Sequence, residues 1–82
     1  MPSANVGTLS EPQFNILTAL AAANSPLTQR ALSVATSMSL GRVNTAIREC
    51  EAAGYIHDRT ITDAGREALE LYRVTGAVIM AA

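Results

Sequence analysis

Three segments of this 82-residue chain carry the same signature of a helix N-terminus, and this repetition constrains the fold more than any other feature. Each segment begins with a hydroxyl residue that can accept a hydrogen bond from the first helical turn. These residues are Ser10, Thr28 and Ser39. Gln13 stands three residues after Ser10, which is the spacing of a capping box. Apolar pairs that can act as hydrophobic staples flank the other two caps: Leu27 with Leu32, and Met38 with Val43.

The apolar spacing that follows each cap gives the extent of the helix. The first is expected over residues 11–23 and ends before a turn that contains Asn24 and Pro26. The second runs from Thr28 to about Ala35. The third covers about 39–53, and Gly54 is a suitable C′ residue to end it.

The third helix has two chemically different faces. The i, i+3, i+4 and i+7 spacing predicts an inward face made of Val43, Ala46, Ile47 and Cys50. The opposite face, predicted to point outward, consists of Gly41, Thr45 and Arg48, flanked by Arg42 and Asn44. This outward face is small, polar and positive.

A short hairpin and a fourth helix are expected next. "YIHDRTIT" places β-branched and aromatic residues on either side of Asp58 and Arg59, which predicts a very short hairpin. Thr62 or Asp63 caps a helix over "DAGREALELY". Its predicted inward residues are Ala64, Ala68, Leu69 and either Leu71 or Tyr72. Residues 77–80, a continuous apolar run, read as a buried β-strand.

The order of elements indicates a mainly α fold with a small β-hairpin, the plan of a winged helix-turn-helix. "LTQRALSVATSMSLGRVNTAIRECEAAGYI" followed by "ITDAGREAL" resembles the MarR-type winged-helix regulators over about residues 28–70. In that family a stretch like "S-L-G-K-V-N" opens the recognition helix and "L-T-x-x-G-R-x-x-L" leads from the wing to the next helix. The resemblance implies three helices, a short wing and a C-terminal helix over residues 10–73, with double-stranded DNA as the partner.

The chain departs from the family pattern at the turn and at the wing. Ser37 stands where the family usually has a Gly with a left-handed backbone, at a cost of roughly 1 kcal/mol. Thr36 replaces a family Leu, and "HDRT" is shorter and less basic than the usual wing. Contacts between the wing and DNA are therefore expected to be few.

The distribution of charge bears on the partner. A net charge of -1 and a pI of about 5.6 argue weakly against a polyanion as partner. However, no Asp or Glu lies between Pro12 and Arg48, and every basic residue of the chain is Arg, whose planar guanidinium suits phosphates and guanine edges. The candidate DNA-binding residues are Arg30, Ser39, Gly41, Arg42, Asn44, Thr45, Arg48 and Arg59.

The last residues carry a second resemblance. "AVIMAA" is similar to the first strand of the sugar-nucleotide and phosphocholine nucleotidyltransferases, which runs into a Gly-rich loop. This resemblance implies that residues 74–82 are a linker and the first strand of a missing C-terminal domain, after the winged helix over 10–73. Residues 1–9 show no apolar period and are expected to be a flexible tail. The resemblance leaves a second function open, namely a regulatory or protein-docking domain of a nucleotidyltransferase with no DNA role.

Several classes of function are not expected. The chain has a single cysteine, Cys50, and no signal peptide, so a reducing, cytoplasmic setting is the default expectation. No apolar run approaches the roughly 20 residues that span a bilayer. No catalytic, metal-binding or cofactor-binding motif is present, and His57 is expected to be structural. A homodimer would suit DNA, because operators usually match the two-fold symmetry of the protein.

Overall fold

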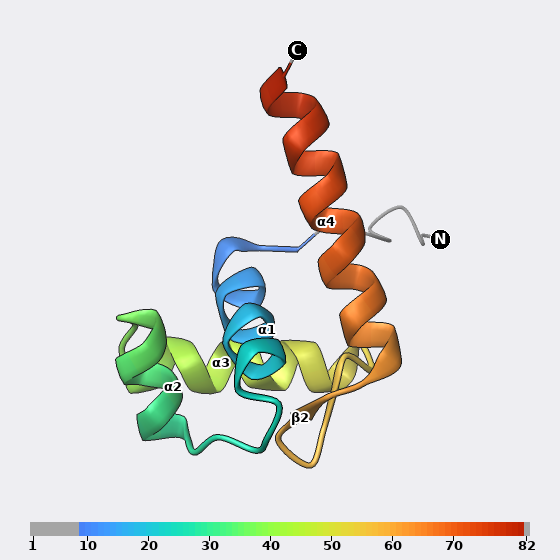
Figure 1. Cartoon of the computed structure of the whole chain (residues 1–82). Helices are drawn as coiled ribbons and strands as arrows, with labels where there is room; N and C mark the ends of the chain where they lie inside the picture. Colours follow the sequence, from blue (N-terminus) through green and yellow to red (C-terminus); the bar gives the residue numbers. More distant parts are fainter. Residues whose placement is uncertain (1–8, 82) are drawn as a thin grey trace.

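The computed structural model describes the backbone of residues 9–81 and the side chains of residues 9–74. Within them the chain forms four helices and two short strands (Figure 1). In chain order these are α1 (Glu11–Ala23), α2 (Gln29–Thr36), α3 (Leu40–Ala52), β1 (Ile56–His57), β2 (Thr60–Ile61) and α4 (Asp63–Ala81). This order confirms the predicted mainly α fold with a small hairpin and is that of a winged helix-turn-helix.

The three predicted N-caps all form. The Ser10 hydroxyl accepts a hydrogen bond from the backbone N–H of Gln13, and the Gln13 side chain accepts one from the Ser10 N–H, so the capping box is complete. Thr28 Oγ1 accepts from a backbone N–H of α2 at 3.0 Å, and Ser39 Oγ accepts from the Arg42 N–H at 3.2 Å. The local sequence therefore defines where α1, α2 and α3 begin.

Helix α1 lies at the centre of the domain, with α2 on one side, α4 on the other and α3 crossing it (Figure 1). The core that these helices share is apolar, and no buried polar or charged residue is found among residues 9–74. Its buried members are Leu9, Ile16, Leu17, Leu20, Leu32, Val43, Ala46, Ile47, Cys50, Ile56, Ala68 and Leu69. Leu9 is only 5% exposed, so the predicted flexible tail of residues 1–9 is wrong at its last residue; residues 1–8 lie outside the described part of the chain.

The turn between α2 and α3 contains a residue with a left-handed backbone although it has no glycine. Ser37 adopts φ 60° and ψ 30°, as predicted for that position. Thr36 donates a hydrogen bond from Oγ1 to the carbonyl of Leu32 at 2.6 Å. The Thr36 hydroxyl is thus satisfied within α2, and the helix ends one residue later than Ala35, the predicted end.

The hairpin is as short as the sequence predicts. Strands β1 and β2 pair antiparallel with Ile56 opposite Ile61. Asp58 and Arg59 form the two-residue turn, and both have positive φ (56° and 64°), as a type I′ turn requires. The wing therefore presents few side chains beyond those at its tip.

The junction between the hairpin and α4 is held by Thr62. Its hydroxyl accepts a hydrogen bond from the Gly65 N–H at 3.0 Å and donates one to the Gly54 carbonyl at 2.6 Å. Its backbone N–H donates to the Tyr55 carbonyl at 2.9 Å. Thr62, the first of the two predicted caps, thereby ties the start of α4 to the end of α3.

The inward face of α4 differs from the prediction in its first turn. Ala68 and Leu69 are buried as predicted, and Tyr72 packs against the core in the next turn. Ala64, however, is exposed, and Gly65 takes the inward place. Gly65 shares the i, i+3, i+4 and i+7 spacing with Ala68, Leu69 and Tyr72, so the prediction placed the inward face one residue too early. The backbone of Tyr55 approaches so closely that only a residue without a side chain fits at position 65.

The strand predicted over residues 77–80 is wrong, because α4 continues as a helix to Ala81. A helix satisfies its own backbone hydrogen bonds, whereas a strand needs a partner, and the sheet formed by the described residues contains β1 and β2 alone. Alanine and methionine are also good helix formers. In Figure 1 the C-terminal half of α4 extends away from the other helices. No helix in the described residues is long and apolar enough to cross a membrane.

Candidate nucleic-acid interface

The exposed face of α3 is fixed by the burial of its opposite face. Val43 and Cys50 are fully buried, together with Ala46 and Ile47, so all four residues predicted to face inward do so. Gly41, Thr45 and Arg48 are exposed on the other side of the helix, at i, i+4 and i+7 spacing, as predicted. We call these three residues the α3 strip.

Two polar residues lie on opposite flanks of the α3 strip. Arg42 is exposed on the flank toward α1 and borders a hollow of about 570 Å³ between the start of α1 and α3. Asn44 is half-buried on the flank toward α2, where its Oδ1 accepts a hydrogen bond from Gln29 Nε2 at 3.2 Å. Helical spacing predicts on which flank Arg42 and Asn44 lie. It does not predict the hydrogen bond from Gln29 to Asn44, because no local sequence pattern relates two side chains that are 15 residues apart.

The polar character of α3 changes along its length. Its N-terminal half carries the Ser39 cap and Arg42, and the helix macrodipole adds a partial positive charge at this end. Acidic residues begin only at Glu49, whose Oε1 accepts a hydrogen bond from Gln13 Nε2 of α1 at 3.0 Å. The N-terminal half of α3 is therefore the part suited to a polyanion.

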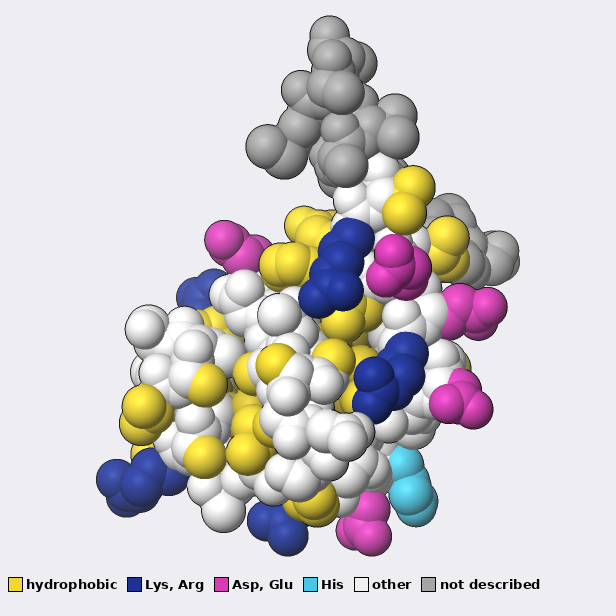
Figure 2. All heavy atoms as spheres, viewed as in Figure 1, with side chains coloured by type: hydrophobic (Ala, Val, Ile, Leu, Met, Phe, Trp, Pro, Cys, Tyr) yellow, Lys and Arg dark blue, Asp and Glu magenta, His cyan; other side chains and the backbone are white. Residues whose placement is uncertain are grey.

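The remaining candidate residues lie outside α3. Arg30 is exposed at the second position of α2, and Arg59 is exposed at the tip of the hairpin. On the face shown in Figure 2 the basic side chains are separated from one another by uncharged surface. The structure thus distributes its positive charge over several elements, which suits contacts to successive phosphates better than a single bound anion.

Cys50 and His57 do not form a chemical site. Burial raises the pKa of the Cys50 thiol to about 12, and the neighbouring carboxylates of Glu49 and Glu51 act in the same direction. His57 is exposed on β1. Among the described residues, no three His, Cys, Asp or Glu side chains gather closely enough to hold a metal ion.

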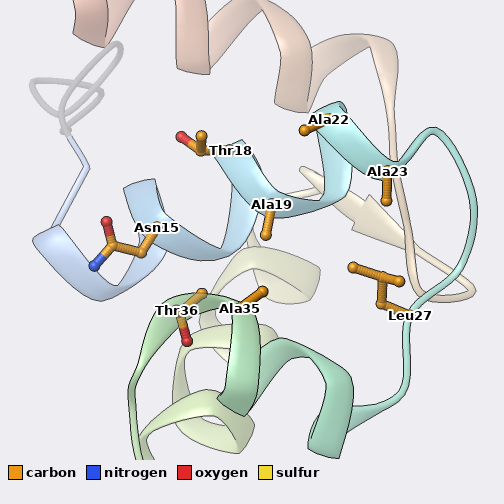
Figure 3. A pocket seen from close by; sticks show the side chains of 8 residues that line it. All are labelled: Asn15, Thr18, Ala19, Ala22, Ala23, Leu27, Ala35 and Thr36. Carbon is orange, nitrogen blue, oxygen red and sulfur yellow. The ribbon is translucent and has the colours of Figure 1, made fainter.

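A second hollow, a groove of about 490 Å³, lies between α1 and α2 (Figure 3). Its lining includes no charged side chain and no residue of α3: Asn15, Thr18, Ala19, Ala22, Ala23, Leu27, Ala35 and Thr36. This groove is therefore not part of the α3 surface.

The fold, in which α3 buries one face and exposes a polar one, is that of a winged helix-turn-helix domain. Comparison with known families agrees: residues 9–57, from the start of the core to the end of β1, match the winged helix-turn-helix DNA-binding family. The match covers more than half of the chain, which therefore belongs to this family. No curated protein and no solved structure matched the chain.

Proposed function

We propose that this chain is the DNA-binding module of a transcriptional regulator, and that α3 enters the major groove of double-stranded DNA. The observation that carries this proposal is the α3 strip, a small, polar and positive surface on a helix whose opposite face is locked into the core. The major groove is about 12 Å wide and admits one helix. The resemblance to MarR-type regulators supports the regulatory role.

The residues of the α3 strip have separate roles in this proposal. Arg48 forms a bidentate contact with a guanine edge, and the Thr45 methyl group contacts a thymine methyl. Gly41 lies in open space, since a Cβ atom added there would meet no atom within 4 Å, and its lack of a side chain lets the helix backbone approach the bases closely. Arg42, on the flank toward α1, reaches a phosphate or a base beside the strip.

Phosphate contacts fix the position of the domain on the duplex. Arg30 and Arg59 are suited to this role because they are exposed on α2 and on the hairpin, away from the α3 strip. Ser39, at the positive end of α3, adds a hydroxyl group that would lie next to the phosphate backbone of the DNA. With only two residues in its turn, the wing contributes little beyond Arg59. A homodimer that binds two half-sites completes the proposal.

The test is a salt titration of DNA binding by fluorescence anisotropy, on random duplexes and on duplexes selected by the protein. The logarithm of the affinity should fall with the logarithm of the salt concentration, with a slope near 0.9 per phosphate contact. Arg30→Ala and Arg59→Ala should weaken binding to all sequences alike and lower the slope by about one unit. Arg48→Ala should instead relax base preference at one position, at a cost of about 1–3 kcal/mol.

A matched control separates these contacts from the effect of net charge. Arg73 lies on α4 and is 3.8 Å from the carboxylate of Glu70, so Arg73→Ala removes the same charge far from the proposed interface. The slope should change little in this variant. If the unmodified protein shows no measurable binding at about 50 mM salt, the DNA proposal is refuted and a protein-docking role becomes the better explanation.

A further inference from the structure

A hydrogen bond between two side-chain amides joins α2 to α3 beside the α3 strip. Gln29 is the first residue of α2, and its Nε2 donates to Oδ1 of Asn44 at 3.2 Å. Gln29 is exposed and Asn44 is half-buried, so the glutamine lies on the outer side of the pair. Asn44 directly precedes Thr45, which places the pair at the border of the α3 strip.

This hydrogen bond changes what Asn44 can recognise. A free asparagine reads adenine with both ends of its amide: its oxygen accepts from N6, and its NH2 group donates to N7. In this structure one of the two lone pairs of Asn44 Oδ1 is engaged by Gln29, which leaves the second lone pair and the NH2 group free. Asn44 would therefore meet the adenine edge with an amide whose orientation is fixed by Gln29.

Gln29 adds a further free acceptor to the pair. Gln29 uses its NH2 group toward Asn44 and keeps its own Oε1 free. If the two amides exchange the roles of donor and acceptor, the unit still has one free NH2 group and one free oxygen. In both arrangements the pair keeps a donor and an acceptor free, and these are the two kinds of group that complement the N7 acceptor and the N6 donor of adenine in the major groove.

We propose that Gln29 is a specificity-determining residue, which reads one adenine together with Asn44 as a linked pair. The inference rests on the proposed function, because it requires α3 to lie in the major groove. The neighbouring Arg30 supports it, since a phosphate contact from α2 would hold the first turn of this helix against the duplex beside the groove.

The experiment selects binding sites from a library of random duplexes with the full chain. Four proteins are compared with the unmodified one: Gln29→Ala, Asn44→Ala, the double variant, and Arg30→Ala as a control at the adjacent position. The unmodified protein should prefer adenine at one position by roughly 5- to 150-fold. Gln29→Ala and Asn44→Ala should each lose that preference at the same position, and the double variant should lose no more than either single variant. Arg30→Ala should bind more weakly and keep the preference.

The outcomes distinguish this inference from the proposed function. If the unmodified protein selects a site and Gln29→Ala keeps the full preference at every position, the linked pair is refuted while DNA binding stands. Additive losses at two different positions would also refute it, because independent contacts do not form a unit. If the unmodified protein binds no duplex, the proposed function fails and the inference fails with it. Circular dichroism melts of all variants check that each is folded.

Discussion

Gly65→Ala is the substitution for which the structure makes the sharpest prediction of stability. A Cβ atom added at Gly65 would lie 2.2 Å from the carbonyl oxygen of Tyr55 and 2.8 Å from Cγ1 of Ile61. Ordinary contact begins at 3.4 Å, so α4 would have to move by about 1.2 Å at its first turn. The obstructing atom belongs to the backbone, and therefore no change of rotamer can relieve the overlap.

The size of the effect follows from what this movement disturbs. Overpacking of this kind costs about 1–3 kcal/mol. The movement also strains the two hydrogen bonds of Thr62, to the carbonyls of Tyr55 and Gly54, each of which contributes about 1 kcal/mol. Alanine recovers up to about 1 kcal/mol of helix propensity. The net loss in the free energy of unfolding should be about 2–4 kcal/mol, or roughly 10–30 °C in Tm for a domain of this size.

The assay is urea unfolding followed by circular dichroism, with Gly41→Ala as the matched control. Gly41 is also a helical glycine, but it has no atom within 4 Å of the added Cβ, so the same change should stabilise the protein by about 0.5–1 kcal/mol. The two substitutions should therefore have opposite signs. Equal stability of Gly65→Ala and the unmodified protein would refute the close packing of α4 against Tyr55.

Three further predictions concern the turn, the core and the thiol. Ser37→Gly should raise the free energy of unfolding by about 0.5–1 kcal/mol in chemical denaturation, because glycine adopts the left-handed backbone (φ 60°) without strain; a loss of stability would contradict this. Ile47→Ala should lower the free energy of unfolding by about 2–5 kcal/mol, because Ile47 is buried. Leu40 lies on the same helix and is 44% exposed, so Leu40→Ala should change the free energy of unfolding by less than about 0.5 kcal/mol. Similar thermal melts for both variants would mean that α3 is rotated from this orientation. The pKa of Cys50 is raised from its ordinary 9.0 to about 12 in the folded protein, so between these pH values the thiol ionises in the unfolded chain but not in the folded one. Ionisation favours the unfolded chain, and the free energy of unfolding should therefore fall as the pH rises from about 9 toward 12. Urea midpoints should fall less steeply over this range in Cys50→Ala, and parallel curves would exclude the thiol as the cause.

The sequence predicts those parts of the fold that local chemistry determines. The caps of α1, α2 and α3 are confirmed, because a hydroxyl before an apolar stripe has one favourable arrangement with the first helical turn. The two faces of α3 are confirmed as well, since helical spacing alone decides which side chains share a face. These two regularities suffice to identify the α3 strip.

The failures lie where distant segments decide the outcome. Helical spacing aligns Gly65, and not Ala64, with Ala68, Leu69 and Tyr72, but no local pattern shows that the Tyr55 carbonyl lies against this position and requires a glycine. Residues 77–80 have the composition of a buried strand, but a strand forms only beside a partner, and α4 offers the same residues a continuous helix. The pairing of Gln29 with Asn44 likewise depends on how α2 crosses α3, which no local pattern contains.

The acidic pI of the chain is compatible with DNA binding because of where its acids lie. Six of the seven follow Arg48 in the sequence, so the start of α3 and all of α2 carry no carboxylate. Glu49, the first acid of α3, is held toward α1 by Gln13, on the flank away from Gln29 and Asn44. A duplex that met the C-terminal half of α3 would face two carboxylates, whereas the N-terminal half offers Arg42 and the positive end of the helix macrodipole. If α3 enters a groove, the duplex must therefore meet the part of the helix that precedes Glu49, which includes Arg48, and Asn44, to which Gln29 of α2 is hydrogen-bonded, lies in that part.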